Sequence, residues 1–108
     1  GDCAFLGCTS LEILVISNQV KKISNYAFDG CTSLMSVIIP DGVKAISSFA
    51  FSDCAELTSI VIPESVKKIG DWNFRGCDLE KLVIHTPSGS YAEQYAKEEG
   101  IRFEAIEK

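Results

Sequence analysis

The strongest constraint on the fold of this chain is a 23-residue unit that recurs along much of its length. Two consecutive copies, residues 24–46 and 47–69, are identical at 11 of 23 aligned positions. A repeat of this length is typical of stacked coils, because one copy cannot bury its apolar face without neighbours. The residues that keep the interval are Cys8, Cys31, Cys54 and Cys77; Phe5, Phe28, Phe51 and Phe74; and Ile23, Ile46 and Ile69.

Each copy contains a six-residue segment with apolar residues at its first, fourth and sixth positions. This is the strand pattern of a leucine-rich repeat, and the 23-residue period lies within the ~20–29 residues of that class. Pro40 and Pro63 follow the segment directly and end strand pairing, because proline has no N–H to donate. The predicted apolar triplets are Leu11, Leu14 and Ile16; Leu34, Val37 and Ile39; Leu57, Ile60 and Ile62; and Leu79, Leu82 and Ile84.

Each coil should have a strand on one side and a short return segment on the other. Val43 and Ile46, three residues apart, would turn inward on the return side. Glycine precedes the cysteine in most copies, where a tight corner favours positive φ, and Asp53 replaces it in one copy. We expect a repeat β-solenoid of the leucine-rich class, a right-handed superhelix with parallel strands on its concave face. About four coils would occupy residues 1–87.

Residues 88–108 leave the repeat and predict a C-terminal cap. Ser90 and Glu93 form a capping box, which begins helices, and Gly100 is a residue type that commonly ends them. We expect a short helix over residues 91–99. The alternation that begins at residue 101 predicts a final strand beside that of the last coil. The polar face of the helix would shield the ends of the core columns from water.

The repeat resembles that of a known bacterial family. Residues 46–63, ISSFAFSDCAELTSIVIP, are similar to the repeat of the BspA-like leucine-rich family, and residues 90–103 resemble its C-terminal closure. This resemblance covers essentially the whole chain. It implies a solenoid from a larger bacterial surface or secreted protein, of a family associated with adhesion. The last coil departs from the pattern, because Cys77 and Leu79 are two residues apart instead of three and Asn73 replaces the recurring alanine.

The cysteine column suggests metal or disulfide chemistry. Zinc needs four ligands at about 2.3 Å, whereas four cysteines one coil apart would extend over roughly 15 Å. Coil spacing alone does not exclude disulfides, but parallel Cβ vectors hold the Cβ atoms farther apart than the ~3.8 Å that a disulfide favours. We predict a buried column of free thiols, no bound metal and no cofactor. Cys3 lies off this column, and its redox state stays open.

The first candidate binding site is the row of residues that point outward between the core positions of the strands. A contiguous apolar stripe on the concave face would suit a docked partner, since exposed apolar patches mark interaction sites. The alternative is structural, because a pleated surface also favours β-branched residues for packing across neighbouring strands. The predicted row is Val15, Ile38, Val61 and Val83.

The second candidate site is a stripe near the corner of the coil, before the inward alanine and phenylalanine. Exposed tyrosine and tryptophan are favoured at interfaces, where a rigid ring supplies a large contact area. The alternative is that each ring only packs on the ring of the next coil. The residues of the stripe are Cys3, Tyr26, Phe49 and Trp72.

Charge and motifs argue against several classes of function. With 15 acidic and 10 basic residues the net charge is −5, which opposes phosphate backbones, so we expect no nucleic-acid partner. No apolar run approaches the ~18 residues of a membrane helix, and we expect no membrane insertion by this segment. Catalytic motifs are absent from the sequence, and the single histidine, His85, aligns with Pro40 and Pro63 as a turn residue. The aligned Lys21, Lys44 and Lys67 are expected to be solvated.

These observations favour a non-catalytic binding module that presents its concave strand face to a protein or glycan. The resemblance implies an extracellular or cell-surface location. The alternative is a structural spacer or cap without a ligand, which should expose no contiguous apolar patch. Because the sequence begins in the middle of a coil, we also expect the Phe5 and Cys8 columns to end uncovered and to allow self-association through the first coil.

Overall fold

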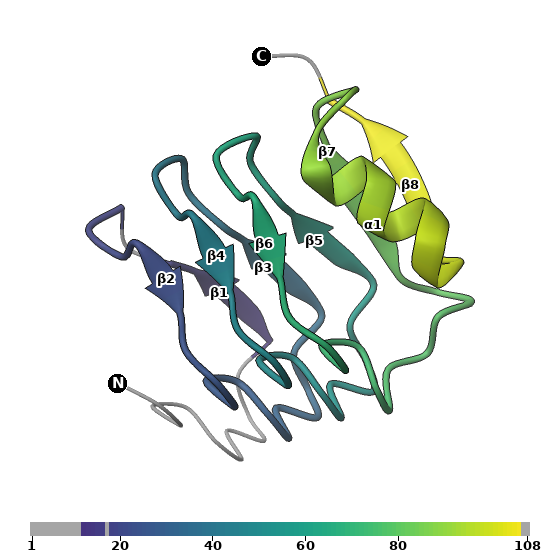
Figure 1. Cartoon of the computed structure of the whole chain (residues 1–108). Helices are drawn as coiled ribbons and strands as arrows, with labels where there is room; N and C mark the ends of the chain where they lie inside the picture. Colours follow the sequence, from purple (N-terminus) through teal and green to yellow (C-terminus); the bar gives the residue numbers. More distant parts are fainter. Residues whose placement is uncertain (1–11, 17, 107–108) are drawn as a thin grey trace.

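Two layers of short parallel strands enclose the core (Figure 1). The computed structural model describes residues 12–16 and 18–106. Within this part of the chain the larger sheet has the strand order β1-β3-β5-β7-β8, and the smaller sheet has the order β2-β4-β6. The larger sheet consists of β1 (Ile13–Val15), β3 (Ser36–Ile38), β5 (Ser59–Val61), β7 (Val83–Thr86) and β8 (Arg102–Ala105), and the smaller one of β2 (Lys22–Ile23), β4 (Ala45–Ile46) and β6 (Lys68–Ile69).

The 23-residue repeat sets the pairing of the regular coils. The strand β3 pairs with β1 on one side and β5 on the other, and Val37 lies beside Leu14 and Ile60, each 23 residues away. The return strands keep the same interval. At the corner, the Phe28 amide donates to the Ala50 carbonyl at 2.8 Å. Hydrogen bonds therefore join successive coils at the corners as well as in both sheets.

A column of phenylalanine rings fills the interior between the layers. The ring of Phe51 stacks on those of Phe28 and Phe74, with centroids 5.5 and 6.3 Å apart. Phe51 is fully buried, and Phe28 and Phe74 are nearly so. Burial of a large apolar side chain stabilises a fold by ~1.5–3 kcal/mol, so this column contributes substantially to the stability of the solenoid. The predicted β-solenoid with parallel strands is confirmed.

The cysteines form an interior column beside the phenylalanines. Cys31 and Cys54 are fully buried, Cys77 is partly buried, and none of the three is in a disulfide bond. The thiol of Cys54 donates to the Phe28 carbonyl, and that of Cys77 to the Phe51 carbonyl, each at 3.3 Å. The predicted thiol column is confirmed for these residues. Cys3 and Cys8 lie outside the described residues.

The corner before each cysteine has the left-handed backbone that the glycine pattern predicts. Gly30 and Gly76 have φ of 79° and 83°, and Asp53 has a φ of 59° at the equivalent position. Aspartate tolerates this region better than most residues, because its short polar side chain bonds locally. The substitution of glycine by aspartate in the third coil therefore preserves the turn.

In the last coil the register of the strand differs from the predicted one by two residues. The strand β7 pairs with β5 at an interval of 24, so that Ile84 lies beside Ile60. The predicted inward position of Leu79 is wrong, because Leu79 is 39% exposed, whereas Leu82 and Ile84 are fully buried as predicted. The physical cause is a turn at Asp78, whose carbonyl accepts from the Lys81 and Leu82 amides and delays the start of the strand.

Asn73, the other departure from the repeat, is fully buried and hydrogen-bonded. Its side-chain oxygen accepts from the Ala50 amide at 2.9 Å, and its side-chain nitrogen donates to the Gly70 carbonyl at 2.9 Å. A buried amide costs free energy unless its polar atoms are paired. Asn73 therefore fits the alanine position by tying the last coil to the coil before it.

The cap begins at the end of β7. Thr86 is buried and its hydroxyl lies 2.8 Å from that of Ser90, which caps the helix α1 (Tyr91–Glu99) by accepting from the Glu93 amide at 3.1 Å. Gly100 ends α1 with a φ of 72°. The helix lies in the layer of the smaller sheet beyond β6 and packs against β7 and β8 (Figure 1). The predicted helix and final strand are confirmed.

Candidate binding surface

The outer strand face, defined as the outward-pointing side of the larger sheet, carries two columns of side chains. Strand pairing places one outward residue of each strand directly beside the next. Side chains in such neighbouring positions are close enough to form a continuous surface. The column at the carboxyl ends of β1, β3 and β5 consists of Val15, Ile38, Val61, His85 and Glu104. The flanking column, two residues earlier in each strand, consists of Ile13, Ser36, Ser59, Val83 and Arg102.

The apolar part of this face lies on the regular coils. We call Val15, Ile38 and Val61 the apolar column. Val15 is 68% exposed, Ile38 is 43% exposed and Val61 is partly buried. Ile13, in the flanking column, is 66% exposed and extends the patch at β1. Neighbouring exposed apolar side chains on successive strands form the kind of patch that marks an interaction site.

Val83 does not continue the apolar column. It pairs with Ser59 and therefore lies in the flanking column, because β7 enters the sheet two residues later than the repeat predicts. A shift of two residues keeps the alternation of strand faces, so Val83 still points outward. The alignment of Val83 with Val61 is wrong, and His85 takes the place beside Val61.

His85 is a strand residue, and its predicted role as a turn residue is wrong. Its Nδ1 atom lies 3.6 Å from a carboxylate oxygen of Glu104 in β8. The column that begins with Val15 thus changes from apolar on β1, β3 and β5 to polar on β7 and β8. The sequence did not predict His85 at this position, because the turn at Asp78 shifts the strand register by two residues and the repeat gives no sign of that shift.

A groove opens beside the apolar column at the carboxyl ends of the strands. It has a volume of about 320 Å³ and is lined by Ile38 and Val61, by the prolines that follow the strands, and by Ile106. Ile106 is held there by a hydrogen bond of 3.1 Å from its amide to the Thr86 carbonyl. The cap therefore supplies one wall of the groove. The prolines are Pro40, Pro63 and Pro87.

The predicted aromatic stripe is continuous over two coils and then ends. Tyr26 stacks on Phe49 with centroids 5.0 Å apart and a ring angle of 8°. Trp72 is 62% exposed, and among the described residues its ring makes no stacking contact with Phe49. All three residues have φ between 60° and 65°. Bulky residues rarely adopt this backbone, and such outliers cluster at functional sites.

Metal and thiol chemistry find no support in the described part of the chain. No group of three or more histidine, cysteine or acidic residues is placed there to hold a metal ion. Burial raises the pKa of Cys77 from 9.0 to about 11, despite the lowering effect of a backbone hydrogen bond, and also raises that of Cys54. A thiol held in its protonated form is a poor nucleophile and a poor metal ligand.

The predictions on membrane insertion and on self-association can be compared with the structure only for the described residues. No helix in residues 12–16 and 18–106 is long and apolar enough to cross a membrane. The predicted self-association involves Phe5 and Cys8, which lie outside the described residues, and it stays a prediction.

Comparison with known proteins identifies the repeat. Residues 1–97 match the family model of the BspA type leucine rich repeat region in six copies. Among solved structures, a leucine-rich repeat protein from Bacteroides ovatus ATCC 8483 is similar, with 30% identity and a TM-score of 0.70 over 98% of this chain. The chain spans 28% of the length of that protein. No curated protein is significantly similar. Proteins with leucine-rich repeats are typically non-catalytic interaction or structural modules.

Proposed function

Because the chain belongs to the BspA-type leucine-rich repeat family, we propose that it is a non-catalytic module that binds a protein through its outer strand face. The observation that carries this proposal is the apolar column on three successive strands, where Val15 and Ile38 are exposed and Val61 is partly buried. Removal of solvated apolar side chains from water lowers the free energy, so a partner that covers this column is stabilised on it.

The partner that suits this face is a protein segment with apolar side chains. The groove beside Ile38 and Val61 is lined mainly by apolar residues and has the concave shape that accepts such side chains. A glycan is the less suitable ligand, because sugar hydroxyls need a dense set of hydrogen-bonding side chains. The flanking column offers Ser36 and Ser59 for hydrogen bonds at the edge of the contact.

The alternative function, a spacer without a ligand, is disfavoured by the same face. A spacer has no need of a contiguous apolar patch, and an uncovered patch increases the risk of aggregation. Ile13 and Val15 are each about two thirds exposed on one strand, and Ile38 extends the patch to the next.

The family resemblance also supports a proposal about the cellular setting. We place the module in a larger protein that is secreted or displayed at the cell surface, where it takes part in adhesion. The net charge of −5 is in keeping with a partner that is neither nucleic acid nor an anionic lipid surface. Detection of the full-length parent protein on intact cells by antibody labelling would test this location, and labelling only after lysis would contradict it.

Selection of peptides from a phage-displayed library of random sequences on the immobilised protein tests the binding function. Labelled synthetic copies of the selected peptides are then titrated by fluorescence anisotropy. We expect the double variant Ile38→Asp with Val61→Asp to weaken their binding about tenfold or more, since burying an unpaired carboxylate at a central contact is costly.

The matched control places the same two charges elsewhere on the same coils. Thr32 and Ala55 are exposed, 23 residues apart and next to the buried cysteines. The variant Thr32→Asp with Ala55→Asp should keep the wild-type affinity, and both double variants should keep a similar thermal unfolding midpoint. Equal peptide affinity for the two double variants would rule out the outer strand face as the binding site.

A further inference from the structure

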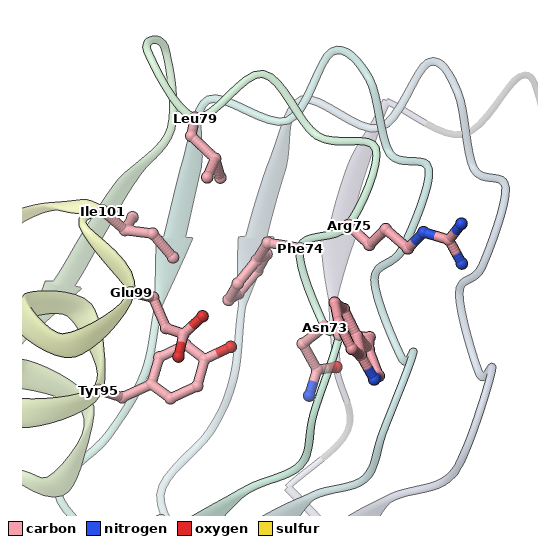
Figure 2. A pocket seen from close by; sticks show the side chains of 8 residues that line it. Asn73, Phe74, Arg75, Leu79, Tyr95, Glu99 and Ile101 are labelled. Carbon is pink, nitrogen blue, oxygen red and sulfur yellow. The ribbon is translucent and has the colours of Figure 1, made fainter.

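A second surface feature lies on the opposite side of the core, where the last coil meets α1. An open cleft of about 280 Å³ is lined by two aromatic residues, Trp72 and Tyr95, and two acidic residues, Asp71 and Glu99. A smaller hollow of about 170 Å³ shares Trp72, Tyr95 and Glu99 and extends toward Leu79 (Figure 2). The cleft is separate from the outer strand face, so an inference about it does not rest on the function proposed above.

The cleft exists because the repeat ends here. At the corner of the second coil the ring of Tyr26 stacks on the ring of Phe49 in the next coil, which leaves Tyr26 40% exposed. After Trp72 the chain continues into the Asp78 turn and α1 instead of another corner, so no such ring follows. Trp72 therefore remains 62% exposed, with a φ of 65°. The exposed Trp72 side chain lines the cleft.

Tyr95 forms the second aromatic wall. Its ring packs edge-on against Phe74, with centroids 6.1 Å apart, which fixes its position on α1. Burial raises the pKa of Tyr95, and the negative charges of Glu99 and Asp71 raise it further, so its hydroxyl stays protonated. Both acidic residues are thus near enough to influence this phenol. Figure 2 shows the Glu99 carboxylate beside the Tyr95 ring.

The two carboxylates of the cleft have no cationic partner among the described residues. The ion pairs in that part of the chain join His85 to Glu104 and Lys97 to Glu93. Arg75 borders the smaller hollow, but its side chain extends away from Glu99 and Tyr95 (Figure 2). The cleft therefore combines two aromatic side chains with uncompensated negative charge.

We propose that this cleft binds an organic ammonium group, between the rings of Trp72 and Tyr95 and beside the carboxylates of Asp71 and Glu99. Aromatic faces attract cations through their quadrupole, and tryptophan does so most strongly. Carboxylates add attraction without adding a competing cation. The volume lies just below the ~300–1,000 Å³ of sites that hold whole small molecules, so a cationic head group or side-chain end fits it better than a large ligand.

The protein contains its own probe for this site, because Trp72 is the single tryptophan of the chain. Titration of the whole chain with choline chloride, followed by tryptophan emission at constant ionic strength, should give a saturable change with a Kd of roughly 1–10 mM. The neutral isostere 3,3-dimethylbutan-1-ol should bind at least about tenfold more weakly, because it has the same shape without the charge. Equal binding of both compounds, or no saturable change with any cation tested, would overturn the proposal.

Charge-neutral variants test the role of the carboxylates. We expect Glu99→Gln and Asp71→Asn each to weaken choline binding about three- to fivefold, as for the loss of an exposed ion pair. Glu98→Gln is the matched control, since Glu98 is on the same helix but bonds to Gln94 at 3.1 Å outside the cleft. Equal effects of the three variants would show attraction by overall charge alone and would overturn the assignment of this site.

The same titration distinguishes two sources of the ammonium group. Nα-acetyl-lysine methylamide represents a lysine of a partner protein, and choline represents a free or lipid-borne quaternary head group. Tighter binding of the lysine derivative would support the proposal with a partner protein as the source, and tighter binding of choline would support it with a small quaternary ligand.

Discussion

The regular coils and the last coil share the stacked apolar core but differ in what fixes the register of their strands. In the regular coils, identical apolar residues stack at intervals of 23, as the fully buried Phe51 and its neighbours show. In the last coil the interval of the strand is 24, and polar contacts of Asn73, Thr86 and Ser90 fix the structure. Stacked apolar columns set an approximate repeat, whereas hydrogen bonds set one particular ending.

The largest expected effect comes from opening the interior column of phenylalanine rings. Phe51→Ala should lower the free energy of unfolding by roughly 3–5 kcal/mol, because it removes a fully buried ring from between two others. Leu79→Ala, in the last coil, should lower it by less than about 1 kcal/mol, since Leu79 is 39% exposed. Urea denaturation followed by circular dichroism measures both. Equal losses would mean that Leu79 is a core residue after all.

The next effect concerns the polar contacts of the last coil. Asn73→Ala restores the residue of the regular coils, and from the repeat alone it should stabilise the protein. The structure gives the opposite expectation, a loss of about 1–3 kcal/mol, because the Ala50 amide and the Gly70 carbonyl would lose their buried partner. Asn25→Ala, at an exposed position, is the control in the same denaturation experiment. A gain in stability for Asn73→Ala would show that apolar stacking governs both regions.

The thiol column predicts a loss of stability in alkaline solution. Burial raises the pKa of Cys77 to about 11 from 9.0 in the unfolded chain, so the folded state binds more protons between these values. The stabilisation is complete below pH 9 and is lost as the pH rises through 11. The free energy of unfolding should therefore fall over this range, and Cys77→Ser should reduce the slope. A flat profile from pH 9 to 11 would argue against a buried, protonated column.

The smallest effect tests the corners of the regular coils. Asp53→Gly should change the free energy of unfolding by less than about 1 kcal/mol, because relief of the left-handed backbone is offset by the entropy of glycine. Asp53→Val at the same exposed position should be clearly more destabilising, since β-branched residues do not tolerate positive φ. Thermal unfolding of the two variants measures the difference. Equal midpoints would mean that the corner adopts another backbone conformation.

The regular coils could be predicted from sequence because each position is repeated. Ile60 and Val61 have equivalents in the neighbouring coils, and these equivalents set which side chain points inward. The last coil could not, since a shift of two residues preserves the alternation of the strand, and both alignments of Val83 place it outward. Only the turn at Asp78 decides between them.

The apolar column and the cleft at Trp72 also differ in whether the sequence predicts them. The apolar column follows from the repeat, because Val15, Ile38 and Val61 occupy one repeated position. The ammonium cleft depends on how α1 docks, since Tyr95 and Glu99 meet Trp72 only through the packing of the helix against the last coil. No local pattern in the sequence joins these residues.

The most direct test of the account is to map where a selected peptide binds. Amide chemical shifts of the isotope-labelled protein, recorded with and without peptide, report each residue in contact. We predict that the largest changes gather on β1, β3 and β5, around Ile38 and Val61, and that α1 is unaffected. Changes centred on α1, on the return strands or on the corners would contradict the claim that the outer strand face of the regular coils is the recognition surface.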